Sequence, residues 1–415
     1  MTLYERVAGR QPASIAVIDA RSGVTWTTGD LLDAASKIEV PKGRRVVVSE
    51  PASPEMLARL LAIWAAGSTA VPLTAGLTER ELRFFREHSS GDSSEALLLY
   101  TSGSTGDPKG VRLSHASVLA SIESTIAHFG LDAGLRMLSL LDPSHGHGLL
   151  VTLLMPLVVG GAVVIEERFS AFSVSRFWQS CEAHGVNAFS SVPAVLRTLH
   201  RLTSTRAASV RLALCASAPL SPGFHRDFEE RFVLPLHNNY GLTETATWVA
   251  RGGRDGHVGV GVEGTLRIQD GEVQVRSPQN TLGYLDNAEA NARLWDGEWL
   301  RTGDLGRLDE GRLVLLGRAK EVIDRGAEKV YPAEVEERLL EHPAVRTAAV
   351  VAGPSKHYGE EPVAFVVASA EPRALRDWCR EGLAAYKVPK RVVVLEDLPR
   401  LRTGKIDKNA LKGLV

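Results

Sequence analysis

The stretch that decides the fold is YTSGSTGDPKGV, from Tyr100 to Val111. Three glycines, two serines, two threonines and one lysine lie within it, so it cannot pack a hydrophobic core. Its many backbone N–H and hydroxyl donors, together with one cation, are a chemistry for holding phosphate oxygens. It is not a Walker A loop, because Lys109 follows Pro108 and precedes Gly110 instead of a serine or threonine.

Both flanks of this stretch have strand patterns. Residues 95–102 (EALLLYTS) form an apolar run typical of a buried strand, and residues 111–114 (VRLS) alternate between apolar and polar side chains. The sequence therefore predicts a phosphate-holding loop between two strands. Composition alone leaves open the alternative of an ordinary surface loop rich in glycine and serine.

YTSGSTGDPKGV resembles the phosphate loop of the adenylate-forming superfamily: acyl- and aryl-CoA synthetases, luciferases and peptide-synthetase adenylation domains. Further stretches resemble the other motifs of this superfamily, in the same order and across most of the chain. In motif style the chain is most similar to acyl-CoA synthetases. The resemblance implies that ATP is held by the loop residues Thr101, Ser102, Gly103, Ser104, Thr105, Gly106 and Lys109.

Length and composition indicate the number of domains and the classes of partner to expect. The chain has 415 residues, 44% of them hydrophobic, and a net charge of −1, so we expect two or more domains. The near-zero charge gives no electrostatic reason to expect a nucleic acid or an anionic membrane as partner. The longest apolar stretch, residues 148–165, contains one proline and two glycines, and we expect no membrane span there.

The N-terminal residues and the cysteines indicate a compartment. The N-terminus lacks the apolar run of a signal peptide. Cys181, Cys215 and Cys379 lie far apart and show no metal-ligand spacing, which is typical of reduced thiols. The sequence therefore predicts a cytoplasmic protein.

Strand and helix patterns alternate through the first half of the chain, which predicts a largely parallel α/β sheet covered on both faces. Predicted strands lie at residues 44–49, 95–102, 111–114, 136–141, 162–165 and 186–190, and predicted helices at 54–67, 115–130, 149–157 and 172–184. From residue 256 to 318, short strands with glycine-rich turns predict a small β-barrel-like subdomain. The resemblance implies an N-terminal adenylation core, residues 1–318, and a small, mobile α+β C-terminal domain, residues 319–415.

Residues 239–245 (NYGLTET) resemble the YGxTE motif of the superfamily. The resemblance implies that Asn239, Tyr240 and Gly241 border the nucleotide, with Tyr240 stacked on adenine. Thr243 would donate to the α-phosphate, and Glu244 would hold Mg²⁺, because a hard cation prefers carboxylate oxygen. A strand end with a glycine turn is the structural alternative for this motif on its own.

Residues 301–305 (RTGDL) resemble the TGD motif of the superfamily. Asp304 would accept hydrogen bonds from the ribose hydroxyls, and Arg318, fourteen residues later, would contact ribose or phosphate. Lys320 occupies the position of the hinge residue between the two domains. Residues 398–406 (LPRLRTGKI) resemble the C-terminal loop whose lysine, here Lys405, would contact the substrate carboxylate and the α-phosphate during adenylation.

Two further stretches concern the acid. Residues 142–149 (DPSHGHGL) resemble the PxFHxxGL segment, in which His145 would guard the entry of the carboxylate and the thiol. The HxHGLL pattern is similar to that of some short-chain dicarboxylate CoA synthetases. The histidine pair suggests a metal site as the alternative, but no other ligand cluster lies nearby in the sequence. The turn ASAPL would border the acid and adenine through Ser217, Ala218 and Pro219.

The resemblance implies a ligase whose catalytic residues are Lys405, His145, Thr243 and Glu244. A carboxylate attacks the α-phosphate of ATP, pyrophosphate leaves, and a thiol then displaces AMP. Coenzyme A is the first choice of thiol, and the phosphopantetheine arm of a carrier protein is the alternative. An aryl or short aliphatic acid is expected, because SLLDPSHGHGL has no aspartate placed to bind an α-ammonium group.

The chain also departs from the superfamily. Only ninety-nine residues precede Tyr100, fewer than is usual, so the sequence predicts an internally shortened but active enzyme. The alternative from another class is a protein that binds a nucleotide without turnover, and such a protein would not need Lys405.

Overall fold

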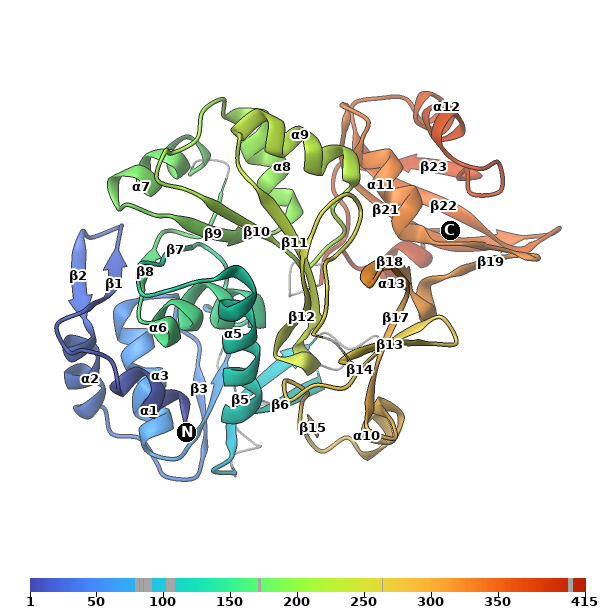
Figure 1. Cartoon of the computed structure of the whole chain (residues 1–415). Coiled ribbons are helices and arrows are strands. Elements are labelled where there is room, and N and C mark those ends of the chain that lie inside the picture. Colours follow the sequence, from blue (N-terminus) through green and yellow to red (C-terminus); the bar gives the residue numbers. More distant parts are fainter. Residues whose placement is uncertain are drawn as a thin grey trace. The chain divides into compact units, whose positions relative to one another are not determined.

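The computed structural model describes residues 1–78, 82, 85, 92–101, 109–170, 173–262, 264–401 and 406–415. They form two compact units (Figure 1). The first unit comprises Met1–Ala218, His225–Leu266 and Val275–Leu300, and the second Pro219–Phe224, Arg267–Gln274 and Arg301–Val415. The domain boundary expected after residue 318 stays a prediction.

An eight-stranded sheet forms the centre of the first unit, in the order β12-β11-β10-β9-β7-β8-β1-β2. The pairs from β11 to β1 are parallel, and only the two edge pairs, β11–β12 and β1–β2, are antiparallel. The predicted parallel α/β sheet is therefore confirmed. The strands are β1 (Ile15–Asp19), β2 (Val24–Thr27), β7 (Arg136–Ser139), β8 (Ala162–Ile165), β9 (Ala188–Ser191), β10 (Leu212–Cys215), β11 (Leu236–Leu242) and β12 (Thr247–Gly253).

The first unit also contains helices. They are α1 (Leu3–Ala8), α2 (Thr28–Ser36), α3 (Pro54–Ala65), α5 (His115–Phe129), α6 (Met155–Val159), α7 (Phe177–Ala183), α8 (Pro193–Leu202) and α10 (Ala288–Leu294), with short turns η2 (Val174–Arg176) and η3 (Thr243–Thr245); α9 (Pro222–Phe232) spans the division between the units. Helix α3 begins as predicted, because the Ser53 side chain caps it and Pro54 occupies its first turn. Its buried side chains join the main core of this unit.

The helix predicted at residues 149–157 differs in type and position. A π-helix, η1 (His147–Leu154), runs directly into α6. Every residue from Gly148 to Leu154 is buried, so no polar face in the sequence reveals the period of the helix. Inside η1 the Thr152 hydroxyl donates to the carbonyl oxygen of Gly148 at 2.6 Å, and a Cβ on Gly148 would lie 2.3 Å from the Asp142 carbonyl oxygen.

A second sheet of the first unit carries the flanks of YTSGSTGDPKGV, in the order β15-β6-β5-β4-β3. Strands β5 (Glu95–Thr101) and β6 (Lys109–Ser114) pair antiparallel, which places the stretch between two strands as predicted. The other strands are β3 (Arg45–Val48), β4 (Thr69–Pro72) and β15 (Gly283–Tyr284).

One buried carboxylate ties three strands of this second sheet together. Glu95, at the start of β5, has a side chain that is 0% exposed. Its Oε1 lies 2.7 Å from Nε of Arg45 on β3, and its Oε2 lies 2.6 Å from Nε of Arg112 on β6. A buried charge is stable only when it is paired, so each guanidinium compensates the desolvation of the carboxylate.

Helix α5 begins at a buried histidine that fixes the N-terminal helix. The backbone N–H of Leu3 donates to Nδ1 of His115 at 3.2 Å, and the His115 ring meets the edge of Trp64. Burial lowers the pKa of His115 from 6.5 to about 4. At neutral pH this side chain is therefore an uncharged acceptor.

Acid is consequently expected to destabilise the first unit through His115. Below about pH 6.5 His115 is protonated in the unfolded chain, whereas in the native state it stays neutral down to about pH 4. The free energy of unfolding therefore decreases as the pH is lowered through this range. Between pH 7 and 5 this residue accounts for about 2 kcal/mol. Urea titrations at both pH values should show a smaller loss in His115→Gln, and an unchanged loss in the control His357→Gln, which alters an exposed histidine. Equal losses in wild type and His115→Gln would contradict the assignment.

Short strands follow between residues 266 and 318, where the sequence predicts a β-rich subdomain. They form a sheet in the order β13-β14-β17-β16, with β18 paired to β17. The strands are β13 (Leu266–Gln269), β14 (Glu272–Val275), β16 (Trp295–Asp296), β17 (Trp299–Asp309) and β18 (Arg312–Arg318).

The described part of residues 319–415 has an α+β fold, as predicted. Its sheet has the order β20-β19-β22-β21, with β23 paired to β22. Alternate residues of β21 and β22 enter two cores: Val350 and Ala364 pack with one helix layer, and Val351 and Val363 pack with Leu411. The elements are η4 (Ala319–Glu321), β19 (Ile323–Arg325), β20 (Glu328–Val330), α11 (Pro332–Leu340), β21 (Val345–Ser355), β22 (Gly359–Ala368), α12 (Pro372–Gly382), β23 (Arg391–Val394) and α13 (Lys408–Lys412).

A double ion pair links three of these elements. Nζ of Lys408, on α13, lies 2.6 Å from Glu321 on η4 and 2.8 Å from Glu336 on α11. Burial lowers the pKa of Lys408, but the charges of Glu336 and Glu321 outweigh it and raise the pKa above its ordinary value. Lys408 therefore stays protonated and holds α13 against η4 and α11.

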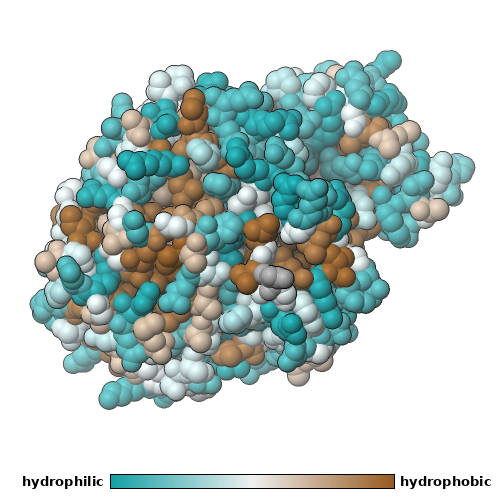
Figure 2. Space-filling model, viewed as in Figure 1, coloured by the Kyte–Doolittle hydropathy of each residue, from teal (hydrophilic) through white to brown (hydrophobic). Residues whose placement is uncertain are grey.

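The face of the molecule shown in Figure 2 carries both hydrophilic and hydrophobic residues. The most exposed large apolar side chains are scattered in the sequence, among them Met1, Val24, Leu202, Val233 and Val262. Scattered exposure of this kind is normal for a folded protein. Within the described ranges, no helix combines the length and apolar character that crossing a bilayer requires.

Candidate active site

The carboxyl ends of the parallel strands lie at one edge of the eight-stranded sheet, and ligands of open α/β sheets bind at that edge. The connections that leave this edge after β7, β10 and β11 carry the residues that the sequence selects for the acid and the α-phosphate. They are His145 after β7, Ser217 and Ala218 after β10, and Thr243 and Glu244 after β11.

The turn that carries Thr243 and Glu244 has a forced geometry. A Cβ on Gly241 would lie 1.7 Å from the carbonyl oxygen of Thr247, so only glycine fits where β11 and β12 come this close. The Thr245 hydroxyl donates to the carbonyl oxygen of Thr247 at 2.8 Å and accepts from the backbone N–H of Leu242. Ala246 and Thr247 then adopt positive φ angles of 45° and 92°. Such conformations are costly and cluster at functional sites.

Glu244 and Lys109 meet the same tyrosine. The hydroxyl of Tyr284, on β15, donates to Oε1 of Glu244 at 2.8 Å. Nζ of Lys109, at the start of β6, lies 5.3 Å from the centre of the Tyr284 ring. The structure therefore brings together the carboxylate and the lysine that the sequence assigns to Mg²⁺ and to phosphate. Tyr284 was not predicted from the sequence, because a lone tyrosine in residues 280–285 (NTLGYL) carries no signal of its own.

The rest of the phosphate loop is only partly described. Thr101 ends β5, and its hydroxyl lies 3.5 Å from the carbonyl oxygen of Lys109 across the two strands. The other predicted loop residues lie outside the described residues: Ser102, Gly103, Ser104, Thr105 and Gly106.

The donor set around Glu244 fits Mg²⁺ that is held largely by phosphates. Mg²⁺ keeps several waters and takes one or two protein carboxylates together with substrate phosphate oxygens. Glu244 supplies such a carboxylate, and its second oxygen is not used in the hydrogen bond from Tyr284. No cluster of three or more metal-ligating side chains occurs in the described part of the chain, which argues against an all-protein cage there.

The predicted ribose residues pair in the second unit. Asp304 on β17 lies directly opposite Arg318 on β18, and its Oδ1 is 2.7 Å from Nε of Arg318. Asp304 is 6% exposed, whereas the Arg318 side chain is 43% exposed. The pair therefore holds a buried carboxylate beside an accessible guanidinium. Lys320 lies two residues on, within η4, and Lys405 lies outside the described residues.

His145 and His147 lie in different environments. The backbone N–H of His145 donates to the Asp142 carbonyl oxygen. His147 opens the π-helix, with Nε2 2.7 Å from the Ser190 hydroxyl and Nδ1 3.1 Å from the Ser217 hydroxyl. Burial, and then the neighbouring His145, lower the pKa of His147 to about 3. The sequence pattern pointed to His145. The bridging role of His147 depends on contacts with residues more than forty positions away, which no local pattern reveals.

Two other predicted nucleotide residues are buried. The side-chain amide of Asn239 donates to the carbonyl oxygens of Cys215 and His237, and its oxygen accepts from the N–H of Gly252. Asn239 therefore links β10 to β12 through its side chain. Tyr240 is 7% exposed, and Ser217, Ala218 and Pro219 are exposed. The nucleotide contacts assigned to all of these residues stay predictions.

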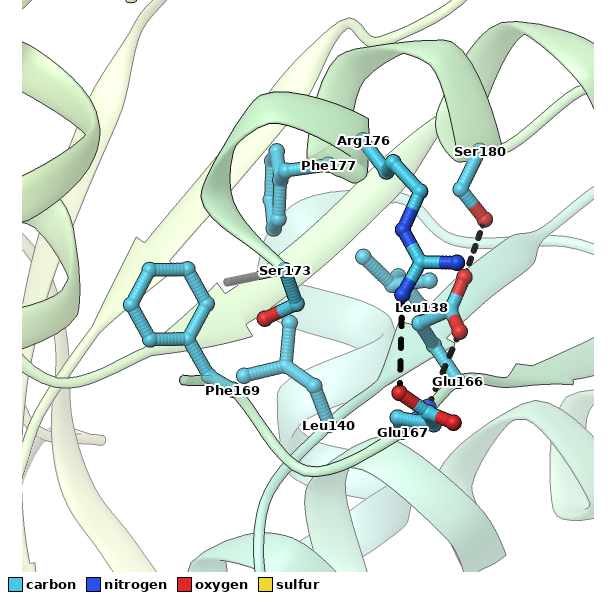
Figure 3. A pocket seen from close by; sticks show the side chains of 9 residues that line it. All are labelled: Leu138, Leu140, Glu166, Glu167, Phe169, Ser173, Arg176, Phe177 and Ser180. Carbon is cyan, nitrogen blue, oxygen red and sulfur yellow. Dashed lines mark hydrogen bonds and ion pairs between the residues drawn. The ribbon is translucent and has the colours of Figure 1, made fainter. Parts of the chain in front are cut away.

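A small hollow lies beside the ends of β7 and β8 (Figure 3). It encloses about 10 Å³, which is room for roughly one water molecule. Its polar groups pair with one another: the Ser180 hydroxyl donates to Glu166 at 2.6 Å, and Arg176 lies 3.6 Å from Glu167. None of the predicted nucleotide residues lines this hollow, so it is separate from the candidate site.

Two family models match the chain. The model of the AMP-binding enzymes matches residues 4–91 and 90–285, and the model of their C-terminal domain matches residues 334–405. The first match falls into two segments that meet at residues 90–91, in the part of the chain before Tyr100 that the sequence predicts to be shortened. Together the two matches cover most of the chain.

Curated relatives are CoA ligases by name. The sulfoacetate–CoA ligase of Cupriavidus necator is 38% identical over 338 residues, which are 75% of this chain and 66% of that protein. This chain thus spans just under two thirds of that relative's length. A probable CoA ligase of Humulus lupulus is 31% identical over 411 residues, which are 91% of this chain and 77% of that protein.

The fold of this chain matches solved structures over nearly its whole length. The o-succinylbenzoate CoA synthetase of Bacillus subtilis, in complex with its acyl-adenylate intermediate, has a TM-score of 0.89 and 29% identity, with 99% of this chain and 98% of that chain covered. Another structure of that synthetase contains ATP and a magnesium ion. These relatives support the predicted ATP- and Mg²⁺-dependent activation of an acid and its transfer to coenzyme A. The predicted superfamily is confirmed: the chain belongs to the family of AMP-binding enzymes.

Proposed function

We propose that this chain is an AMP-forming acid–thiol ligase, which converts a carboxylic acid to an acyl-adenylate and then to a coenzyme A thioester. The observation that carries the proposal is the pair of charges on either side of Tyr284. Glu244 is fixed by the tyrosine hydroxyl and Lys109 lies against its ring, so a carboxylate for a metal and a cation for phosphate converge on one point.

The proposed roles follow from the chemistry of each side chain. Lys109 attracts the phosphates that leave as pyrophosphate, and the Thr243 hydroxyl donates to the α-phosphate. Glu244 holds Mg²⁺, which, when bound, neutralises phosphate charge as the α-phosphate is attacked. Asp304 accepts from the ribose hydroxyls while Arg318 contacts ribose or phosphate, and the guanidinium of Arg318 lies 2.7 Å from the buried Asp304 carboxylate.

The two half-reactions are assigned to two poses of the C-terminal domain. Lys405 would serve adenylation, and the thiol would later need the same space, so the domain beyond residue 318 would rotate about Lys320. This boundary and this hinge are proposals. They are supported by the position of Lys320 in the short turn η4, between β18 and β19.

We further propose that the acid carries a second oxygen-rich group. Ser190, His147 and Ser217 form a chain of hydrogen-bonding groups at the sheet edge, and the Ser217 end of it is exposed. Such an edge suits an acid with a sulfonate or a second carboxylate better than a purely apolar acid. The relatives named for sulfoacetate and o-succinylbenzoate support the same class.

Two observations bear on the acceptor and on the compartment. The named CoA ligases favour coenzyme A over the phosphopantetheine of a carrier protein. A cytoplasmic location is supported by Cys181, Cys215 and Cys379, each of which is buried and unbridged.

Pyrophosphate release with matched acids tests the proposal. Sulfoacetate should be compared with acetate, and 2-succinylbenzoate with benzoate, because each pair differs by the second group. Mass spectrometry with coenzyme A or a carrier protein then identifies the thioester. Pyrophosphate release from a two-group acid and from neither control supports the proposal. Binding of ATP without pyrophosphate release from any acid would favour a non-catalytic nucleotide-binding protein.

A further inference from the structure

The Tyr284 side chain contacts both Glu244 and Lys109. Its hydroxyl donates to Oε1 of Glu244 at 2.8 Å, and its ring lies 5.3 Å from the ammonium of Lys109. A phenol hydroxyl is one donor on a rigid ring, so its position fixes the position of the oxygen that accepts from it. The two contacts therefore couple the orientation of the carboxylate to that of the lysine.

The hydrogen bond divides the two oxygens of Glu244 between two tasks. Oε1 accepts from Tyr284, which leaves Oε2 to face a cation. A hydrogen bond to an ionised acceptor is stronger than one between neutral groups, so it restrains the rotation of the carboxylate. A restrained carboxylate offers one oxygen to Mg²⁺ in a fixed direction, and Mg²⁺ demands near-ideal octahedral geometry.

The backbone around Tyr284 is held on both sides. Its own N–H donates to Oδ1 of Asn291 at 2.7 Å, and Nδ2 of Asn291 donates back to its carbonyl oxygen at 2.8 Å. On the other side β15 pairs with β6, opposite Val111. These contacts fix the backbone from which the Tyr284 ring projects.

A neighbouring contact holds the backbone of Glu244 to the same segment. The N–H of Thr281 donates to the Glu244 carbonyl oxygen at 2.7 Å, and the Thr281 hydroxyl donates to the carbonyl oxygen of Arg112 at 2.6 Å. Glu244 is thus attached to residues 281–284 through both its main chain and its side chain. The segment in turn is attached to β6, which begins with Lys109.

We propose that Tyr284 is a positioning residue for the metal site: its hydroxyl orients the Glu244 carboxylate for Mg²⁺, and its ring orients Lys109 for phosphate. The inference rests on the proposed function, because it takes Glu244 as the Mg²⁺ ligand. The proposal assigns one role to the hydroxyl of Tyr284 and another to its ring. The hydroxyl acts on the metal alone, and the ring acts on ATP even without metal.

Two substitutions separate these two roles. Tyr284→Phe removes only the hydroxyl, and Tyr284→Leu removes the ring as well. The probe is an ATP analogue with a methylene group between the α- and β-phosphates, which binds without being cleaved. Its affinity is measured by calorimetry in EDTA, and the affinity of the resulting complex for Mn²⁺ is measured by electron paramagnetic resonance. Neither readout depends on turnover.

We expect Tyr284→Phe to lower Mn²⁺ affinity roughly tenfold and to leave analogue affinity in EDTA within about twofold of wild type. Tyr284→Leu should lower both, with a loss of about two- to fivefold in EDTA because the contact with Lys109 is lost. The matched control is Tyr358→Phe, whose ring lies 3.8 Å from the guanidinium of Arg325 in the second unit. The control should match wild type in both measurements.

A double-mutant cycle tests whether Tyr284 acts through Glu244. In the Glu244→Gln background, Tyr284→Phe should change Mn²⁺ affinity by less than about twofold. An equal tenfold loss in both backgrounds would overturn the inference, and so would an unchanged Mn²⁺ affinity in Tyr284→Phe alone. If wild type binds the analogue but Tyr284→Phe behaves like wild type, only this inference fails. If wild type does not bind the analogue, the proposed function fails and this inference with it.

Discussion

Replacing Glu95 by glutamine is expected to lower the free energy of unfolding of the first unit by roughly 3–5 kcal/mol. The side chain is 0% exposed, and its two oxygens lie 2.7 and 2.6 Å from the guanidinium groups of Arg45 and Arg112. Glutamine keeps the volume but removes the negative charge, so Arg45 and Arg112 both lose the buried carboxylate that they pair with. The Arg45 side chain is only 8% exposed, so water compensates little of this loss.

Urea denaturation followed by tryptophan fluorescence measures this effect close to the site, because Trp64 donates its indole N–H to the carbonyl oxygen of Ala96. The matched control is Glu289→Gln, which breaks an ion pair with Arg293 on α10. That glutamate is 76% exposed, and such surface pairs contribute about 0.3–0.5 kcal/mol. If the two variants unfold at similar urea concentrations, the Arg45–Glu95–Arg112 group is not a major contribution to stability.

Lys405→Ala is expected to reduce acyl-adenylate formation by roughly 10²–10³-fold. The reason is the loss of the ammonium that would face the carboxylate and the α-phosphate while negative charge builds on the phosphoryl oxygens. The same variant should still convert a supplied acyl-adenylate to the thioester. Pyrophosphate release and thioester formation are measured separately, and Lys412→Ala, an exposed lysine on α13, serves as the control.

Lys320→Pro should give the opposite result, because proline fixes φ and resists a rotation at this position. It should form the adenylate and fail to transfer the acyl group. A folded Lys405→Ala that has lost both half-reactions, or a Lys320→Pro that has lost neither, would contradict the two-pose mechanism.

Local patterns in the sequence predicted the elements well where a cap or a short apolar run marks their ends. The helix at 115–130 and the strand at 162–165 agree with α5 and β8, because caps and short apolar runs are local signals. The π-helix at His147–Leu154 escaped prediction because its residues are buried on all sides. Backbone hydrogen bonding alone distinguishes it from an α-helix, and side-chain types do not report it.

In the candidate site, too, local patterns revealed some residues and not others. Glu244, Lys109, Asp304 and Arg318 were selected from motifs, and the structure joins them in two pairs, one through Tyr284 and one directly. Tyr284 and His147 were not selected, because their roles depend on partners that are distant in the sequence. A single sequence records the identity of such residues but not the neighbours that give them a role.

The double ion pair of Lys408 bears on the timing of the proposed domain rotation. Glu321 directly follows Lys320, the proposed hinge residue, and α13 begins three residues after Lys405. Because Lys408 ties α13 to Glu321, the end of the Lys405 loop is anchored next to the pivot and not at the far side of the second unit. The anchored end of the loop therefore arrives together with the rotating domain, and we expect one kinetic phase for the change of pose instead of a rotation followed by a slower settling of the loop.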